Sequence, residues 1–424
     1  MRGSHTSTDR TSAGEGQAFW LPGLDGIRAL AALAVVIHHE EQAREFMGLP
    51  STWSTNIPLE RLGGLGVSLF FVLSGFLITL LLLRESNLFG SISVKHFYIR
   101  RILRIWPLYY FVVLLGFFVL PQFGAYAIGE FPQLTSEHFW QKLFLYVIFA
   151  PQVAGAIIGH SGYAGVLWSV GVEEWFYLIW PWVVVMMRRW LIPILLVTIY
   201  IFGYYRWHVP AVWLHKLLLQ LRFDCLAVGA LGGILCSSVR WRPIVLRSFL
   251  FSRPAQLIVL ATLSYCLWFG VDFFDKDEWI YSMKIGKYFF NPDELIYSMM
   301  FLWLIINVSH NKASILNLDI QPLKFIGKVS YGVYCYNWIA IVTGLAFLRS
   351  LGVNLDHGPA RYFSYVFGLA LSVAFAALSY RLIEKPFLAL KDRSFTPHFP
   401  LTRPERRGED VDANPENCAI QRSE

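Results

Sequence analysis

The sequence is poor in charge, and this argues against an ordinary soluble domain. Asp, Glu, Lys and Arg together make up 15% of the 424 residues, whereas 55% are hydrophobic and 17% are aromatic. In soluble globular domains about a quarter of the residues are charged. The mean hydropathy of +0.47 points the same way. We therefore expect a polytopic integral membrane protein.

Cysteine pairs, sequence repeats and strand-like alternation are also missing. The cysteines form no CxxC pair and show no metal-ligand spacing, so we infer neither disulfides nor a metal site: they are Cys225, Cys236, Cys266, Cys335 and Cys418. Without β-barrel alternation, the spanning structure is expected to be an all-α helix bundle. The net charge of +7 is spread over short loops between apolar segments. That distribution encodes membrane orientation, so no nucleic-acid partner is expected.

The two ends of the chain differ from its middle. Residues 1–20 are rich in Ser, Thr and Gly, and they open with MRGSH, which resembles an expression-vector leader. They contain no evident cleavable signal peptide. The polar residues 394–424 predict a disordered tail. We expect a disordered cytoplasmic N-terminus over 1–20, one transmembrane domain over 21–393 and a disordered cytoplasmic tail over 394–424.

Apolar segments and basic clusters predict the topology. Eleven apolar segments are visible: 24–44, 63–83, 103–121, 139–153, 167–187, 191–206, 218–237, 255–272, 293–309, 325–348 and 362–383. The basic clusters fall on one face only if one segment between Arg104 and Arg188 does not cross. Segment 139–153 is the weakest candidate, because it is short and interrupted by Pro151. The expectation is about ten transmembrane helices plus one interfacial or re-entrant helix, with both termini cytoplasmic.

The stretch LDGIRALAALAVVIHH, residues 24–39, carries ionisable groups within an apolar run. Such groups are costly in hydrocarbon unless they face a partner or a wet cavity. Eleven positions separate Arg28 from His39, which is about three helical turns, or about 16 Å on one stripe. Asp25 lies one turn before Arg28 and can pair with it, whereas His38 points elsewhere. A lone histidine can simply bond a neighbouring carbonyl, but this one shares its stripe with an arginine, and imidazole is suited to accept a proton from a hydroxyl.

A second polar stripe lies in LWSVGVEEWFYLIWP, residues 167–181. Ser169, Glu173 and Tyr177 recur every four residues and line one helix face, while Glu174 is turned away by about 100°. A carboxylate there can orient a histidine or polarise an acceptor hydroxyl. The alternative is a solvated helix end with an interfacial aromatic belt, which explains the tryptophans better than it explains Glu173.

A basic loop, FYIRRILRIWP, spans residues 97–107. Its Arg101 and Arg104 share a helix face, and Arg100 lies one turn from Arg104. Arginine forks bind phosphate bidentately, so the loop suits a cytosolic donor with several phosphates. Orientation signalling and contact with lipid headgroups explain the same charges equally well.

Three further stretches have mainly structural interpretations. The small residues of GLGVSLFFVLSGFL, 64–77, let helices approach closely, although they can also make room for a bound chain. Arg222 and Asp224 face largely away from each other on one helix, so each is expected to find a partner on another helix. SYGVYCYNW, 330–338, and RLIEKPF, 381–387, are interpreted as a packing segment and a helix stop.

Taken together and in this order, the motifs resemble the membrane acyltransferase family 3, which includes bacterial O-acetyltransferases of lipopolysaccharide and exopolysaccharide and macrolide acyltransferases. The resemblance rests on LDGIRA with ten residues between its arginine and the histidine, SLFFVLSGF, RRILRIWP, LWSVGVEEWFY, RFDCLAVG, SYGVY and EKPF. It extends over about residues 21–390. Many members carry a fused extracytoplasmic domain, for which we expect no room here.

The resemblance implies a ten-helix enzyme that takes an acyl group from cytosolic acyl-CoA, usually acetyl-CoA, to a hydroxyl of a glycan, with no permanently bound cofactor. It makes His39 the catalytic histidine, Arg28 its partner and Glu173 a second active-site residue. Arg100, Arg101 and Arg104 become candidates for the CoA phosphates. One position departs from the family pattern, because Asn337 stands where the family often has a histidine after SYxxYxx.

The acceptor stays open at the level of sequence. The expected partners are acyl-CoA, membrane lipid and a polysaccharide or lipopolysaccharide in a bacterial inner membrane. A small hydroxylated product such as a macrolide is the alternative acceptor. The alternative from another class of protein is a proton-coupled transporter. Protons would then be relayed by His39, Arg28 and Glu173, but no inverted repeat is visible. Direct transfer and an acyl-histidine intermediate are both compatible with the residues, and the sequence does not fix the oligomeric state.

Overall fold

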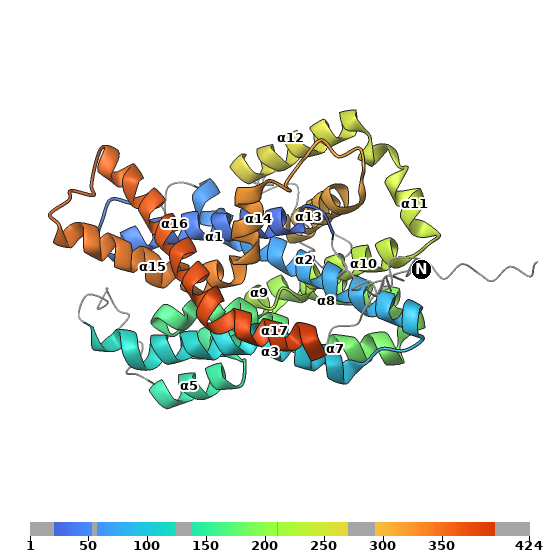
Figure 1. The fold of residues 1–424 in the computed structure, drawn as a ribbon, viewed down its shortest axis with the longest axis horizontal. Helices are drawn as coiled ribbons and strands as arrows, with labels where there is room; N and C mark the ends of the chain where they lie inside the picture. Colours follow the sequence, from blue (N-terminus) through green and yellow to red (C-terminus); the bar gives the residue numbers. More distant parts are fainter. Residues whose placement is uncertain (1–20, 53–56, 124–137, 210, 270–292, 395–424) are drawn as a thin grey trace, which may run out of the picture. The chain divides into compact units, whose positions relative to one another are not determined.

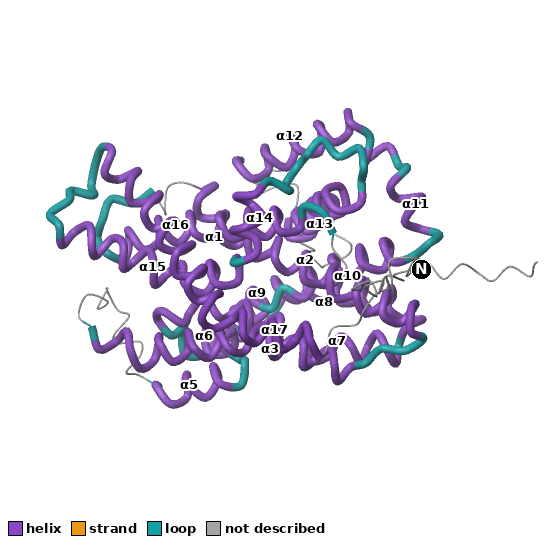
Figure 2. Tube along the Cα trace, viewed as in Figure 1, coloured by secondary structure: helices purple, strands orange, loops and turns teal. Residues whose placement is uncertain are grey.

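The computed structural model describes residues 21–52, 57–123, 138–209, 211–269 and 293–394. Within these ranges every regular element is a helix and no strand occurs (Figure 2). The all-α prediction is therefore confirmed. Residues 1–20 and 395–424, which we expected to be disordered, lie outside the described residues, whereas Ser394, the first residue of the expected tail, is the last residue of a helix.

The helices follow the apolar segments along the chain (Figure 1). Their bounds are α1 Leu24–Phe46, α2 Ile57–Phe89, α3 Val94–Leu114, α5 Phe139–Val147, α6 Pro151–Ile157, α7 Trp168–Met186, α8 Leu191–His208, α9 Val212–Gln220, α10 Phe223–Ser237, α11 Trp241–Leu246, α12 Arg253–Phe269, α13 Asp293–His310, α14 Gln321–Lys328, α15 Ser330–Ser350, α16 Pro359–Ser379 and α17 Lys385–Ser394. The described part of every predicted segment is mainly helical, but three segments contain a break. These breaks lie between α5 and α6, between α9 and α10, and between α14 and α15.

The number of membrane spans falls short of the ten that we expected. Five helical stretches of the described chain are long and apolar enough to cross a bilayer: Pro58–Phe89, Val94–Gln122, Val212–Ser237, Ser330–Ser350 and Pro359–Leu390. A sixth is possible if the bent pair Pro151–Ile157 and Gly162–Met186 forms one span. Helix α1 carries six charged residues, and α12 and α13 are only 17 and 18 residues long. The protein is a membrane protein, but the ten-span count is not confirmed.

Segment 139–153, which we expected not to cross, is broken at Phe149. This residue has φ 58°, in the left-handed region that a bulky side chain rarely adopts. Pro151 then starts α6 at a position where a missing N–H costs nothing. Helix α6 and the helical stretch Gly162–Met186 meet at 119°. Segment 139–153 is therefore not one straight helix, and the chain bends again between α6 and α7.

Helices α2 and α10 pack with their backbones in close approach. A Cβ atom at Gly75 would lie 2.0 Å from the carbonyl oxygen of Leu226, and one at Gly229 would lie 2.0 Å from that of Val72. Only glycine fits at these two points. The structural interpretation of the small residues in segment 64–77 is confirmed for Gly75.

Helix α1 lies against α2, α14, α15 and α16 (Figure 1). Its first turn is fixed by glycine contacts: a Cβ at Gly327 of α14 would lie 1.9 Å from the backbone oxygen of Asp25. Farther along, a Cβ at Gly66 of α2 would lie 2.8 Å from the backbone oxygen of Ala31. These contacts set the position of α1, and with it the ionisable side chains that the helix carries.

Candidate functional site

Asp25 and Arg28 form the ion pair that their spacing predicted. Nη1 of Arg28 donates a 2.7 Å hydrogen bond to Oδ1 of Asp25, one turn earlier in α1. Their side chains are 25% and 34% exposed, which leaves the other donors of the guanidinium open to a ligand. Helix α1 then runs without a break from Leu24 to Phe46. Arg28 and His39 are therefore about 16 Å apart along one helix, on nearly the same face.

His39 is held through one ring nitrogen by a side chain from a distant helix. Its Nδ1 lies 2.6 Å from Oδ1 of Asn337 in α15. The amide nitrogen of Asn337 donates a 2.6 Å hydrogen bond to the carbonyl oxygen of Tyr334. Because that carbonyl can only accept, the amide oxygen of Asn337 must face His39, and the histidine must carry its proton on Nδ1. Nε2 is then the basic nitrogen.

The other contacts of the His39 ring leave Nε2 accessible. The residue is half-buried, and its ring packs against Trp338 with centroids 5.5 Å apart. Among the described residues Nε2 takes part in no hydrogen bond. His38, by contrast, turns to α2 and its Nδ1 lies 3.0 Å from the carbonyl oxygen of Leu59, as its different helical face predicted. The two adjacent histidines therefore differ in their partners: His39 is held by a side chain of the distant helix α15, whereas His38 contacts the backbone of α2.

The sequence interpretation of segment 330–338 as a packing segment was incomplete. Asn337 is fully buried and is the hydrogen-bond partner of His39. Tyr334, one turn earlier, accepts a 2.7 Å hydrogen bond from the hydroxyl of Ser169 in α7 and donates one of 2.8 Å to the carbonyl oxygen of Val166. Helix α15 thus connects the histidine helix with the start of the glutamate helix.

Glu173 and Tyr177 share a helix face in α7, as predicted. The Tyr177 hydroxyl donates to Oε2 of Glu173 at 3.1 Å, and the Ser74 hydroxyl of α2 donates to Oε1 at 2.5 Å. Ser169 belongs to the same sequence pattern, but its hydroxyl donates to Tyr334 and not to Glu173. Glu174 faces α3 instead, where Trp106 Nε1 donates to it at 3.1 Å. Ser74 is a site residue that the sequence analysis missed, since it lay within an apparent packing motif.

The three arginines of the basic loop differ in their partners. Arg100 forms a 3.1 Å ion pair with Glu85. The guanidinium of Arg101 stacks over Phe97 and Tyr177, each 5.6 Å from the ring centroid, and its buried Nε has no partner. Arg104 makes no hydrogen bond or ion pair with any described residue.

Electrostatic contacts bring Arg104 and Arg28 into the same group. The Arg104 guanidinium interacts electrostatically with Arg28 and with Glu173. Tyr177 interacts in the same way with Arg28 and Arg101. The start of α1, the basic part of α3 and the polar face of α7 therefore meet in one region. Cationic donors that carry no ion pair of their own, at Arg101 and Arg104, can bind an anionic ligand there.

Arg222 and Asp224 lie at the start of α10, away from the contacts just described. Nη1 of Arg222 forms a 3.1 Å ion pair with Glu294 of α13 and donates to Ser68 and to the carbonyl oxygen of Gly64 in α2. The expected partner on another helix is therefore present for Arg222. Asp224 is buried. Among the described residues, no three His, Cys, Asp or Glu side chains are placed to hold a metal ion.

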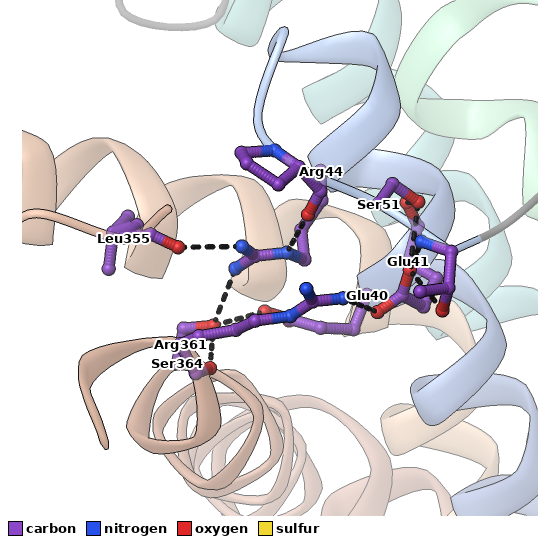
Figure 3. A network of polar contacts seen from close by, with 9 residues as sticks. Glu40, Glu41, Arg44, Ser51, Leu355, Arg361 and Ser364 are labelled. Carbon is purple, nitrogen blue, oxygen red and sulfur yellow. Dashed lines mark hydrogen bonds and ion pairs between the residues drawn. The ribbon is translucent and has the colours of Figure 1, made fainter. Parts of the chain in front are cut away.

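A charged network beyond His39 was also missed by the sequence analysis. Figure 3 shows Arg44 of α1 reaching toward α16 and the loop before it. Its guanidinium donates to the carbonyl oxygens of Pro50 and Leu355 at 3.0 and 2.7 Å and to Ser364 at 3.1 Å. Ser364 donates to Glu40 at 3.0 Å. Glu40 and Arg44 have the i, i+4 spacing of a helical pair, and this was the signal that could have found them.

Glu41 completes the network on the other side of α1. Its carboxylate accepts from Arg361 of α16 at 3.3 Å and from Ser51 and the backbone of Thr52 at 2.8 and 2.5 Å (Figure 3). Glu41 and Arg44 are fully buried. The network therefore ties the end of α1 to α16 and to residues 50–52, only one or two residues beyond His39.

Comparison with known proteins gives relatives of one kind. A protein of Staphylococcus aureus strain COL that is provisionally named an O-acetyltransferase is 28% identical over 399 residues, which cover 87% of this chain and 57% of that protein. A protein of Listeria monocytogenes named peptidoglycan O-acetyltransferase OatA is 26% identical over 408 residues, covering 89% and 58%. An O-acetyltransferase OatA of another S. aureus strain is 27% identical over 389 residues, covering 87% and 57%.

The chain thus spans somewhat more than half the length of these curated relatives. No solved structure matches it. The family model described as an acyltransferase domain matches residues 21–381, which include α1, the basic loop, α7 and α15. The chain therefore belongs to the membrane acyltransferase family 3.

Proposed function

We propose that this chain is an integral membrane O-acyltransferase that moves an acetyl group from cytosolic acetyl-CoA to a hydroxyl of a glycan, with His39 as the base. The observation that carries the proposal is the pair of 2.6 Å contacts that Asn337 makes to His39 and to the Tyr334 carbonyl oxygen. This arrangement fixes the neutral tautomer with Nε2 free, which is the form that a general base requires.

The proposed reaction balances with this one base. Nε2 of His39 takes the proton of the acceptor hydroxyl as its oxygen attacks the thioester carbon. The carbon–sulfur bond then breaks, and the departing thiolate takes the proton back from the imidazolium, so the products are an ester and free CoA. During the attack, Oδ1 of Asn337 accepts from Nδ1 and keeps the ring oriented. Asn337 is a positioning residue in this scheme.

The donor is proposed to bind at Arg101 and Arg104. Both guanidiniums have donors without protein partners, whereas Arg100 is occupied by Glu85. Arginine forks bind phosphate oxygens bidentately, and the CoA moiety carries several phosphates. Arg28 lies near Arg104 and on the stripe that leads to His39, which suits it to hold the part of the donor between the phosphates and the thioester. Glu173, held by Ser74 and Tyr177, balances these cations.

The acceptor class is proposed from the relatives. One of them is named for O-acetylation of peptidoglycan, and all three are named O-acetyltransferases. We propose an exported or cell-surface glycan in bacteria as the acceptor, with the enzyme in the inner membrane and both termini in the cytoplasm. A macrolide-like hydroxyl would undergo the same chemistry, so the acceptor is the part of the proposal that experiments must assign.

The test is acetyl transfer by the purified protein. The protein is reconstituted in lipid nanodiscs and given radiolabelled acetyl-CoA with soluble peptidoglycan glycan strands or with a neutral oligosaccharide. We expect label in the glycan as a base-labile ester and release of free CoA in equal amount. Release of CoA without labelled glycan would contradict the proposed acceptor. Absence of both products, with the protein folded, would contradict acyl transfer altogether.

A further inference from the structure

Four polar atoms without partners gather where α6 meets the end of α9, outside the contacts used so far. They are the carboxamide oxygens of Gln152 and Gln220, Nδ1 of His160 and the hydroxyl of Ser161. Gln152 is 0% exposed and Ser161 is 1% exposed. A buried polar atom without a hydrogen bond costs about 1–3 kcal/mol. Such a concentration in one place calls for a ligand or for ordered water.

Contacts show that Gln220 and His160 face each other and that α6 packs against the histidine ring. Nε2 of Gln220 lies 3.1 Å from Nε2 of His160. The His160 ring lies against Gly155 of α6, where a Cβ would come within 2.2 Å of Cε1. Gln152 lies three residues before Gly155 on α6, and its carboxamide oxygen lies beside α7, where a Cβ at Gly171 would come within 2.3 Å of it. Ser161 follows His160 directly and is anchored by its backbone N–H, which donates to the Tyr146 hydroxyl at 3.1 Å.

The cluster offers both donors and acceptors. The Gln220 amide donates to Nε2 of His160, which places the histidine proton on Nδ1 and leaves it without an acceptor. The carboxamide oxygens of Gln152 and Gln220 remain without donors. A hydroxyl group can accept a hydrogen bond from Nδ1 of His160 and donate one to a carboxamide oxygen, so it can satisfy these unpaired atoms.

The charge of the cluster favours a neutral ligand. Its four side chains are two amides, an alcohol and a neutral imidazole. Lys142 of α5 interacts electrostatically with His160, and its side chain is buried. A phosphate or sulfate site would present guanidiniums or several ammonium groups, as the basic loop does. The cluster therefore matches a molecule with several hydroxyl groups, such as a neutral sugar.

The chain just after Gln220 contacts the start of α2. Two residues after Gln220, Arg222 donates to the carbonyl oxygen of Gly64 at 3.3 Å. At the preceding residue, Gly63, a Cβ would lie 2.3 Å from the ring of His38. The His38 and His39 rings are 5.3 Å apart. Arg222, two residues after Gln220, and His38, the neighbour of His39, thus contact the same short part of α2.

We propose that Gln152, His160, Ser161 and Gln220 form the subsite for the acceptor, a neutral hydroxyl-bearing sugar that reaches His39 past the start of α2. This inference rests on the proposed function for the reaction at His39, but sugar binding itself does not require the reaction.

The test measures sugar binding directly and separately from transfer. Chitotetraose is titrated into the protein in nanodiscs by calorimetry, without a donor. The test variant is the double substitution His160→Leu and Gln220→Leu, which removes both partners of one hydrogen bond and so avoids creating a new unpaired atom. We expect its affinity to fall at least about tenfold, as loss of two hydrogen bonds of about 1 kcal/mol each implies. The Michaelis constant for the sugar should rise in parallel, with that for acetyl-CoA changed less than about twofold.

Gln256→Leu is the matched control. Gln256 is also 0% exposed, but its carboxamide is bonded at both ends, to Phe251 and Ala313 through nitrogen and to Asn307 through oxygen. Its loss should lower the melting temperature and leave the affinity of the folded protein for the sugar unchanged. If the double variant does not fold, Gln220→Asn, which shortens the side chain but keeps the amide, serves instead.

The outcomes separate the two proposals. Equal binding by the wild type and the variant would mean that the four atoms bind water only, and it would overturn the subsite. No sugar binding by a wild-type protein that still transfers acetyl to another acceptor would also overturn it, and the proposed function would stand. Sugar binding that depends on these residues, in a protein that neither cleaves acetyl-CoA nor transfers acetyl, would support the subsite and overturn the proposed function.

Discussion

At the scale of single residues, the local part of the site was predictable and the distant part was not. The Asp25–Arg28 pair and the Glu173–Tyr177 pair follow from spacings of three and four residues on a helix, and both are present. Asn337 lies 298 residues from His39 in the chain. No periodicity reports a contact over that distance. The departure from the family pattern at Asn337 was visible, but its consequence for the tautomer of His39 needed the fold.

Asn337 allows a test of the orienting role through the pH dependence of the rate. Asn337→Asp keeps an acceptor for Nδ1 and adds a negative charge that stabilises the imidazolium. His39 then stays protonated up to a higher pH, so the acidic limb of the kcat profile should move to higher pH. Asn337→Leu removes the acceptor and should lower kcat by about tenfold to a hundredfold. An unchanged profile in the Asp variant would show that Asn337 does not act on the histidine.

The basic loop makes a separate prediction, because its arginines are differently occupied. Arg101→Gln and Arg104→Gln should each raise the Michaelis constant for acetyl-CoA by about tenfold, the equivalent of one charge-assisted hydrogen bond of about 1.5–3 kcal/mol. For a dephospho-CoA thioester, the same substitutions should raise the Michaelis constant by a smaller factor. Arg100→Gln is the control, since Arg100 is paired with Glu85 and should affect stability instead. Equal effects on the donor in all three variants would reject a specific phosphate site.

At the scale of elements, hydropathy located the helices, but it did not locate the breaks within them. The break at Phe149 depends on a left-handed backbone, and those at Leu221 and Val329 lie inside segments that the apolar pattern predicted as single helices. These breaks carry function in our account: Gln152, Gln220 and Asn337 all lie within about two turns of one. Local apolar pattern cannot report them, because a broken helix and a straight one can have the same hydropathy.

The network at the end of α1 is expected to stabilise the helix that carries His39. Arg44→Met removes hydrogen bonds to two carbonyl oxygens and to Ser364, and it leaves Glu40 and Glu41 buried with less opposing charge. Loss of one partner in a buried charged network costs about 3–5 kcal/mol. We expect a large fall in the melting temperature in detergent.

Arg349→Met is the comparison for Arg44→Met, since Arg349 contacts the neighbouring backbone at Met47 by one exposed 3.2 Å hydrogen bond. It should change the melting temperature little, as surface contacts usually do. If both variants have the same melting temperature, the buried network does not stabilise α1 more than the surface contact does.

Close packing between α2 and α10 gives a second prediction at this scale. Gly75→Ala places a methyl group 2.0 Å from the backbone oxygen of Leu226, and neither backbone can move without breaking helical hydrogen bonds. Overpacking of this kind costs about 1–3 kcal/mol or more. Gly64→Ala, on the same helix, meets only the end of Arg222 at 3.6 Å and should be tolerated. The melting temperatures of the two variants, measured together, check this; equal values would contradict the close approach.

At the scale of the whole molecule, composition was enough to predict the class of protein, but it was not enough to predict the number of membrane crossings. Low charge and long apolar runs predicted an all-helical membrane protein, and both the helices and the family agree. The number of crossings depends on which apolar helices face lipid and which are covered by protein. Helix α1 illustrates this, because its Glu40 and Glu41 contact Ser364 and Arg361 of α16, which no segment-by-segment scale can include.

The central claim is that His39 is the base, and substitution of the two adjacent histidines tests it most directly. His39→Ala should reduce acetyl transfer from acetyl-CoA by about 10²–10⁴-fold, the usual contribution of a general base, in a protein that still folds and inserts although Oδ1 of Asn337 loses its partner. His38→Gln keeps a donor for the Leu59 carbonyl oxygen and should retain most of the activity. If the His39 variant transfers acetyl at the wild-type rate, or if the His38 variant loses activity as completely as the His39 variant, the account is wrong.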